Sequence, residues 1–582
     1  MISKTPQFDL ALDKILEELV PHMRACLWAG KHKYCEGDFE ITKEDIEFLN
    51  LLRAPAPKYC PTCRRMRRYV HMNQTRFFKR PCNAPGHSEQ MISILPPECP
   101  FPVYDYKYYL SDSFDPFQFG RKYDPSHSPL EQLFALRKAT PMPSFLNRDL
   151  ASINSDYSNG GRDSKNCYYT FEVFESEDVW YSGLAAKSRE IMDSVAVMKC
   201  DTAYDVVQSE HVFKSISVYF SKDCTDSILL NDCRNCQDCF GCVNLRNKKY
   251  CIWNEQKTKE EYEMFIKENT PLSYAKMLEF KKRFDELVHS LPLNASRNVS
   301  VSNVSGTIIR NGRNLFDVSD SDKSEHVRHS DGVLSHKDSM DVLFSGGNSE
   351  LLYQTTNVGS QSSRVLFSVS SKFATDCEFV FNSKNLSHCF MCIGMQDKSY
   401  CILNTQYEPE EYWKLVDEIK TDMLARGEYG EFADLKFSAQ SYNSSMAGIY
   451  FPLSSEIIES CGGFVSVESE IDMHGLNAIS AKDLPDTIQE VDNSILQKAI
   501  LCEKTGRPFR IIQSELNFLR KMGLPIPRIN PIVRSENRYK LIPVAVKYQT
   551  KCEKCKKEIQ SIYNPNEGFR LYCESCFQQE VV

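Results

Sequence analysis

The chain has 582 residues, a formal net charge of −8, 24 cysteines and a composition that is 42% hydrophobic and 25% charged. This length allows roughly three to five domains, and the composition is typical of globular proteins rather than disordered ones. No run of about eighteen apolar residues occurs, which argues against a membrane-spanning segment and a membrane partner. The first residues, MISKTPQFDLALDKILEEL, lack the apolar core of a signal peptide. We therefore expect a cytoplasmic protein whose clustered cysteines bind metal rather than form disulfides.

The N-terminal part predicts a helix over residues 1–25, followed by a basic metal-binding module and connector over residues 26–149. Two knuckles in this module have a spacing typical of a closed, structural zinc site, and their predicted ligands are His32, Cys35, Cys60 and Cys63. Cys26 is an alternative to His32 as the fourth ligand. Cys82 and His87 form a further pair, which we expect to be buried rather than bound to metal.

A basic run overlaps this module, since nine Lys or Arg and no Asp or Glu lie between Arg53 and Arg80. Guanidinium groups suit phosphate oxygens, and the aromatic residues of this run can stack on unpaired bases. The predicted nucleic-acid contacts here are Arg64, Arg65, Arg67, Arg68, Arg76, Lys79 and Arg80. The alternative is that this basic face docks on the acidic middle of the same chain or on a protein partner.

Residues 150–255 carry a 12-residue period, in which a polar pair precedes an apolar residue or a cysteine. Cys167, Val179, Ile191 and Ala203 follow one another at this interval. Twelve residues are too few for a helical repeat and suit a short strand plus a turn, so that stacked arcs would form a β-solenoid. The alternative is a β-sandwich with coincidental spacing.

Four cysteines near the end of this block, Cys233, Cys236, Cys239 and Cys242, have the spacing C-x2-C-x2-C-x2-C. An iron–sulfur cluster is one interpretation, but such runs usually close with C-x3-C-P and use a distant ligand. Buried cysteine packs as a small apolar residue. We therefore predict that these thiols belong to a core ladder.

Helical periodicity over residues 256–299 predicts helices that cap the first block. Residues 300–405 carry the 12-residue period again and predict a second block. The ends of the two blocks are related, because Cys239–Tyr262 and Cys389–Tyr412 share 12 of 24 residues without a gap. Residues 406–500 begin with another amphipathic helix and continue as a connector without a catalytic or binding motif.

The C-terminal part repeats the N-terminal module, since Phe39–Tyr69 and Phe509–Tyr539 share ten of 31 residues. Residues 501–545 are therefore a degenerate copy. Its knuckle positions have lost the metal-binding pattern and hold Cys502, Thr505, Asn530 and Val533. Its basic residues complete the predicted nucleic-acid contacts: Arg534, Arg538 and Lys540.

Residues 546–582 predict a zinc ribbon. Two C-x2-C knuckles with seventeen residues between them can fold back and place four thiolates around one ion. The predicted ligands are Cys552, Cys555, Cys573 and Cys576.

Several strings carry a resemblance to a known family: F-E-I-T-x-E-D followed by P-x-P-x-x-C-P-x-C-R-x-x-R-R, VYDYKYYLSDSFDPFQFGRKYD, NSDYSN, KNCYY, CFGCVNLRNKKYCIWN and the ending YCESCFQQEVV. The chain resembles an uncharacterised family of cysteine-rich zinc-ribbon and β-solenoid proteins common in reduced-genome candidate-phylum bacteria. The resemblance is strong over about residues 30–265 and departs at the degenerate second knuckles and the weaker cysteine pattern of the second block. It implies intracellular zinc binding and this domain order, and it implies no substrate.

We predict a mainly β protein with two tandem right-handed β-solenoid-like blocks, capping helices and small flanking zinc-ribbon-type modules. The sequence has no phosphate-binding loop, dinucleotide-binding motif, nucleophile elbow or H-E-x-x-H, and its recurring aspartates, such as Asp193 and Asp317, fit turns. The expected function is a non-catalytic scaffold, stabilised by structural Zn2+, that binds nucleic acid, RNA more than DNA, or a ribonucleoprotein. One alternative is a structural or assembly protein that binds protein partners or itself. A third is a polysaccharide-active β-solenoid enzyme.

Overall fold

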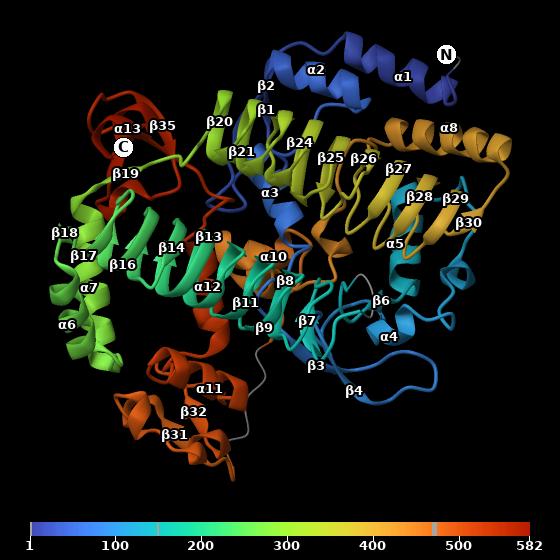
Figure 1. The fold of residues 1–582 in the computed structure, drawn as a ribbon. Helices are drawn as coiled ribbons and strands as arrows, with labels where there is room; N and C mark the ends of the chain where they lie inside the picture. The colour runs from blue at the N-terminus through green and yellow to red at the C-terminus, as the bar shows by residue number, and fades with distance from the viewer. Residues whose placement is uncertain (1–2, 148–150, 468–473, 582) are drawn as a thin grey trace.

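The computed structural model describes residues 3–147, 151–467 and 474–581 (Figure 1). Two large sheets dominate it, one of 12 strands and one of 11, so the predicted mainly β class is confirmed. Helices lie at the ends and along the sides of these sheets (Figure 1). None of the helices within these ranges combines the length and the apolar character that a bilayer crossing requires.

The 12-stranded sheet, called here the first ladder (β7–β18), has parallel neighbouring strands except at its last strand, β18. Ile191 pairs with Val179 on one side and with Ala203 on the other, and all three side chains are buried. Equivalent side chains 12 residues apart therefore stack into a continuous apolar core. The strands are β7 (Tyr157–Asn159), β8 (Tyr168–Phe174), β9 (Glu177–Trp180), β10 (Gly183–Ala186), β11 (Arg189–Met192), β12 (Val195–Met198), β13 (Asp201–Tyr219), β14 (Lys222–Thr225), β15 (Ile228–Asn231), β16 (Arg234–Val243), β17 (Lys249–Ile252) and β18 (Glu255–Gln256).

A left-handed backbone conformation recurs at every third residue from Asn166 to Asp238, with φ between 45° and 58°. Four such residues fall within each 12-residue step of the ladder. Asp and Asn adopt this conformation more readily than most residues, and Asp193 and Asp205 are among them. The recurring aspartates therefore do occupy turn positions.

The 11-stranded sheet, called here the second ladder (β20–β30), has the same arrangement with two longer steps. Cys377 pairs with Cys389 in a regular 12-residue step, whereas 13 residues separate His336 from its partner Ser349. The strands are β20 (Ser302–Arg310), β21 (Arg313–Asp322), β22 (Glu325–Arg328), β23 (Asp331–Leu334), β24 (His336–Ser345), β25 (Ser349–Thr356), β26 (Ser363–Leu366), β27 (Lys372–Glu378), β28 (Lys384–Phe390), β29 (Gln396–Ile402) and β30 (Thr405–Gln406).

Helices follow each ladder in the segments where they were predicted. After the first ladder come α6 (Lys259–Asn269) and α7 (Tyr274–Ser290), and Phe240 of the ladder packs edge-on against Phe265 and Phe280 from these helices. After the second ladder comes α8 (Pro409–Ala425), which runs beside α1 (Pro6–Glu17) (Figure 1). The backbone N–H of Phe8 donates to the carboxylate of Asp417 at 2.8 Å, which fixes α1 to α8.

The N-terminal module docks on the second ladder, and its degenerate copy near the C-terminus docks on the first. The N-terminal module consists of β1 (His22–Ala25), β2 (Asp38–Ile41), α2 (Lys43–Leu52) and α3 (Pro61–Tyr69), and its degenerate copy of β32 (Ala499–Leu501), β33 (Pro508–Phe509), α11 (Gln513–Met522) and α12 (Pro531–Lys540). Helix α3 contacts β24 and β25 of the second ladder, whereas α12 contacts β12 of the first. A short helix, α9 (Met446–Tyr450), contacts both α3 and α12.

The remaining segments contain short elements. The C-terminal ribbon is attached to the rest of the chain by strand pairing, since Leu571 pairs with Leu293 between the two ladders. These elements are β3 (Phe78–Pro81), β4 (Gln90–Ser93), β5 (Val103–Tyr104), α4 (Tyr106–Tyr109), η1 (Pro116–Phe119), α5 (Pro129–Ala139), β6 (Met142–Pro143), β19 (Pro292–Asn294), η2 (Leu435–Phe437), η3 (Tyr442–Ser444), α10 (Ser455–Ser460), β31 (Ala478–Ser480), η4 (Ala481–Asp483), η5 (Ile488–Glu490), η6 (Asn493–Gln497), β34 (Tyr548–Lys551), β35 (Glu558–Ser561), η7 (Pro565–Glu567), β36 (Arg570–Tyr572) and α13 (Glu574–Val581).

Candidate metal centres

The C-terminal ribbon brings four thiols together. Cys552 and Cys555 lie in the turn between β34 and β35, Cys573 directly precedes α13, and Cys576 lies in its first turn. Their four sulfur atoms are all within 4.8 Å of one another, and Cys555 Sγ lies 3.7 Å from Cys573 Sγ. Four sulfurs bound to one tetrahedral ion at about 2.3 Å are about 3.8 Å apart. The predicted group can therefore hold a metal ion.

Backbone N–H groups favour the thiolate form in this ribbon. Burial raises the pKa of Cys552, but hydrogen bonds from the backbone of Cys555 and Cys573 outweigh it and lower the pKa to about 6. The left-handed conformation of Lys556 closes the knuckle, because its N–H donates to the carbonyl of Cys552 at 2.9 Å. Thiolates are the metal-binding form of cysteine, so this environment favours metal binding.

The N-terminal module holds a second group of four thiols: Cys26, Cys35, Cys60 and Cys63, again all within 4.8 Å. The backbone N–H of Cys60 donates to Cys26 Sγ at 3.3 Å, and that of Cys63 donates to Cys60 Sγ at 3.5 Å. Hydrogen bonds of this kind orient metal ligands. The predicted ligands Cys35, Cys60 and Cys63 therefore come together as expected.

Cys26, and not His32, completes this group, which corrects the predicted ligand set. His32 lies beside the thiols, with Nε2 3.4 Å from Cys63 Sγ, and its ring packs edge-on against Trp28. Burial lowers the pKa of His32 below its usual 6.5. Cys26 directly follows strand β1, just as the ligand Cys552 directly follows strand β34. This shared position was the signal that could have identified Cys26 as the fourth ligand.

The degenerate copy keeps the shape of the module without a thiol group. Cys502 follows β32 as Cys26 follows β1, and its sulfur accepts the backbone N–H of Asn530 at 3.3 Å. The Asn530 side chain donates to Thr505 Oγ1 at 3.2 Å and accepts the N–H of Val533 at 3.0 Å. One amide side chain thus joins the two knuckles and caps α12.

The cysteines of the ladders form no third group of this kind among the described residues. The thiol of Cys233 donates to the carbonyl of Cys242, and that of Cys236 to the carbonyl of Leu245, both at 3.5 Å. These side chains are buried, as the core-ladder prediction requires. Cys82 is also buried, while His87 Nδ1 contacts Glu89 at 2.7 Å instead.

The arginines that follow the second N-terminal knuckle point into the molecule. Arg64 Nε lies 2.7 Å from one carboxylate oxygen of Asp341, and Arg68 Nη1 lies 2.9 Å from the other. All three side chains are at most 2% exposed. Burial raises the pKa of Asp341, but the two guanidinium groups outweigh it and lower the pKa below its usual value.

Two further arginines of α3 are paired in the same way. Arg65 lies 2.7 Å from Asp331, and Arg67 lies 3.0 Å from Glu431 while its guanidinium stacks 4.0 Å above the ring of Tyr59. Because these side chains are buried and paired with carboxylates, they are not available to phosphate groups. The predicted nucleic-acid contacts of α3 are therefore corrected: Arg64, Arg65, Arg67 and Arg68.

The degenerate copy shows the same pairing on the other ladder. Arg538 lies 2.9 Å from Asp205, and Arg534 lies 3.2 Å from Asp193 and 3.6 Å from Glu515. Both arginines are buried. The predicted nucleic-acid contacts of Arg534 and Arg538 are corrected for the same reason.

The four other predicted contacts differ among themselves. Arg76 is half-buried and lies 2.9 Å from Glu536, so it joins the two end modules. Arg80 is buried and donates to the carbonyl of Pro96 at 2.8 Å. Lys79 and Lys540 are exposed.

Sequence reasoning did not identify the carboxylates that form ion pairs with these arginines. Asp193 and Asp205 are 12 residues apart, and Asp317 and Asp341 are separated by two such steps. They were interpreted as turn residues, which their positive φ angles support, but their side chains also form ion pairs with the docked modules. The available signal was the acidic period itself, which complements the basic helices in charge.

A comparison with models of known protein families found no match, and a comparison with curated proteins found none either. The resemblance to cysteine-rich zinc-ribbon proteins thus stays a prediction.

Proposed function

We propose that the protein is a non-catalytic scaffold stabilised by two structural zinc ions. The observation that carries this proposal is the pair of four-thiol groups, one in each terminal region of the chain. Four thiolates complete a tetrahedral coordination shell and leave no open position for a substrate. Thiolate ligands select zinc over magnesium or calcium, and zinc has no redox chemistry.

We infer that the two ladders are right-handed β-solenoids that act as rigid blocks. Their 12-residue register and their buried columns of stacked side chains support this assignment. The crosswise docking of α3 and α12 would hold the two blocks at a fixed separation. The resemblance to cysteine-rich zinc-ribbon and β-solenoid proteins agrees with this inference.

Protein partners, with a second copy of this chain as the first candidate, fit the surface better than nucleic acid. Six large apolar side chains of the N-terminal region are 40–64% exposed: Leu10, Ile15, Val20, Met23, Leu27 and Leu51. A contiguous apolar surface favours a protein interface, and we propose that these six side chains contribute to one. The arginines that would contact phosphate already have carboxylate partners, and freeing them would leave buried charges unpaired.

We infer a cytoplasmic location. All 24 cysteines are free thiols, and reducing compartments keep thiols in this state. The two four-thiol groups need reduced cysteines to bind zinc.

Metal analysis and assembly measurements test the proposal. We expect two zinc ions per chain, and unfolding of both zinc modules when a chelator removes them. Sedimentation should reveal self-association that Met23→Lys weakens and Ile153→Lys, a matched change at an exposed site outside this region, does not. A folded protein without metal would contradict the zinc assignment.

A salt series with RNA and DNA separates the two partner classes. Nucleic-acid binding that persists at physiological salt, with log affinity falling by about 0.7–0.9 per contact against log salt, would contradict the protein-scaffold function. A strictly monomeric protein would contradict self-association.

A further inference from the structure

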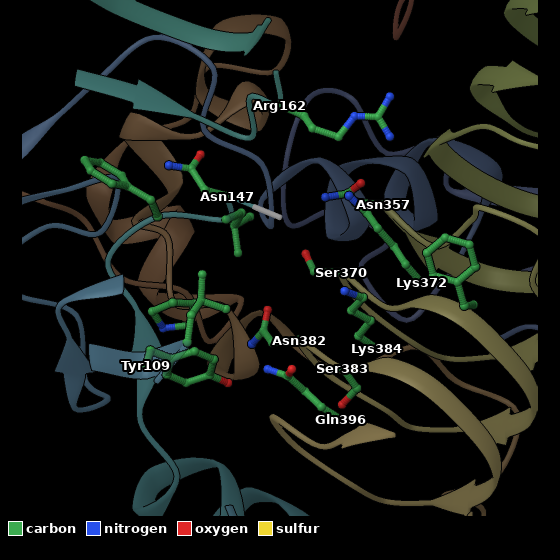
Figure 2. Close-up of a pocket in the computed structure, with 15 residues that line it drawn as sticks. Tyr109, Asn147, Arg162, Asn357, Ser370, Lys372, Asn382, Ser383, Lys384 and Gln396 are labelled. Atoms are coloured by element: carbon green, nitrogen blue, oxygen red, sulfur yellow. The ribbon is translucent and has the colours of Figure 1, made fainter. Parts of the chain in front are cut away.

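A cavity of about 290 Å³ opens between the N-terminal connector and the two ladders. Figure 2 shows polar side chains from all three parts around one open space. Its volume is close to the lower end of the range of small-molecule sites, about 300–1,000 Å³. The polar lining consists of Tyr109, Asn147, Arg162, Asn357, Ser370, Lys372, Asn382, Ser383, Lys384 and Gln396.

The charged residues that line the cavity are all cationic. Among the described residues that line the cavity, Arg162, Lys372 and Lys384 are cationic and none is Asp or Glu. Arg162 lies 3.0 Å from Asp163 and 3.7 Å from Glu175, which neutralise part of its charge. A concave site with an excess of positive charge attracts anions.

A smaller inner chamber of about 20 Å³ adjoins the cavity and contains a buried arginine. The two spaces share part of their lining: Pro143, Leu146, Ser370 and Asn382. Arg137 of α5 lines the chamber, and its side chain is buried. The positive charge of Arg137 therefore lies next to the inner end of the cavity.

Arg137 differs from the buried arginines of α3 and α12, because no ion pair joins it to a carboxylate in the described part of the chain. Its Nη1 contacts Met142 Sδ, its Nε donates to the carbonyl of Phe437 at 3.4 Å, and its guanidinium lies 4.4 Å above the ring of Phe101. Burial lowers the pKa of Arg137 to about 10. A buried charge without a counter-ion destabilises a fold, so an anion bound here would stabilise it.

Several buried polar atoms around the same two spaces lack hydrogen-bond partners within the described ranges. Tyr109 Oη and Asn147 Oδ1 belong to the cavity, and His71 Nε2 and Gln440 Oε1 belong to the inner chamber. Buried polar atoms are normally hydrogen-bonded. A polar ligand bound beside Arg137 could supply hydrogen-bond partners to these atoms.

We propose that this cavity binds a small phosphate ester, with the phosphate near Arg137 and Lys384 and the organic part among the amide and hydroxyl side chains. A phosphate monoester carries nearly two negative charges and suits several converging cations, whereas a carboxylate carries one. The amides of Asn357 and Gln396 can donate to and accept from hydroxyl or base groups of the ester. A volume of about 290 Å³ suits a small molecule rather than a nucleic-acid strand.

Calorimetry and thermal unfolding of the full-length, zinc-loaded protein test the proposal with AMP and glucose 6-phosphate as probes. Adenosine, glucose and inorganic phosphate are the controls. We expect at least one ester to raise the unfolding temperature, while adenosine and glucose leave it unchanged. Absence of any shift with both esters, or equally tight binding of inorganic phosphate, would overturn the phosphate-ester site.

Two variants locate the binding. Lys384→Glu should weaken ester binding at least tenfold, whereas Lys337→Glu, a matched change at an exposed lysine of the same ladder, should not. Arg137→Met should raise the unfolding temperature of the ligand-free protein and abolish the ester-induced shift. Because Lys384 is exposed, its variant remains informative even if Arg137→Met fails to fold. Unchanged binding in Lys384→Glu would overturn the proposal.

Discussion

Arg64 Nε donates to the carboxylate of Asp341 across 2.7 Å, although 277 positions separate the two residues in the chain. This contact fixes α3 of the N-terminal module to the second ladder. Arg538 and Asp205 do the same for α12 and the first ladder across 333 positions. The N-terminal module and its degenerate copy are thus each fixed to one of the two central ladders through buried ion pairs.

Asp341→Asn should destabilise the protein strongly. The change leaves Arg64 and Arg68 buried without a negative partner, and breaking a buried pair costs about 3–5 kcal/mol. Urea unfolding measures the loss. Asp376→Asn is the control, because Asp376 pairs with the exposed Arg364 on the same ladder and such a pair contributes about 0–1 kcal/mol. Equal effects of the two changes would contradict the role given to Asp341.

The ligand set of the N-terminal centre can be measured by metal analysis. Cys26→Ser should lower the zinc content from two ions per chain to one, because it removes one of the four thiols. His32→Asn should leave the content at two, since His32 lies beside the group rather than in it. The opposite pattern would restore His32 as the fourth ligand.

The metal ligands were largely predictable because each knuckle is a local pattern, such as Cys552 and Cys555. The 12-residue register was predictable for a similar reason, since inward residues such as Val179 and Ile191 repeat along the chain. The partner of Arg64 was not predictable, because Asp341 lies 277 positions away in the sequence. In addition, the sequence of a basic run is the same whether its side chains face solvent or a buried carboxylate. Burial, which depends on tertiary structure, decides between these outcomes.

Glu515 predicts a pH dependence of stability. Burial raises the pKa of Glu515 to about 7, although Arg534 and the hydroxyl of Tyr181 oppose the shift. Since the ordinary value is 4.5, the folded state binds more protons than the unfolded state between about pH 4.5 and 7, and stability falls as pH rises through this window. Glu515→Gln should remove this fall and stabilise the protein at pH 8, as unfolding at several pH values would reveal.

Asp45 provides the matched control, because it occupies the equivalent position in the N-terminal module. Burial raises its pKa, but His329 and Arg328 outweigh it and lower the pKa below 3.8. The stability that ionised Asp45 contributes to the folded state is therefore present at neutral pH and lost as pH falls. Asp45→Asn should destabilise the protein at pH 8, opposite in sign to Glu515→Gln, and changes of the same sign would contradict both assignments.

The degenerate copy should regain a metal centre when its thiols are restored. Cys502 already accepts a backbone N–H as Cys26 does. Combining Thr505→Cys, Asn530→Cys and Val533→Cys would create two C-x2-C knuckles with 24 residues between them, the same number that separates Cys35 from Cys60. We expect three zinc ions per chain, with Thr505→Cys alone as a control that stays at two. A folded triple variant with two ions would show that the two modules differ in more than their ligands.

The N-terminal module and its degenerate copy also differ in what holds their knuckles together. In the proposed function, the four-thiol group beside α3 needs a metal ion from the surroundings, whereas the Asn530 side chain beside α12 is part of the chain itself. Loss of zinc would therefore weaken the docking of α3 on the second ladder and leave the docking of α12 on the first ladder unchanged. The docking of α3 on its ladder would thus respond to the zinc supply, whereas the ion pairs of α12 would not.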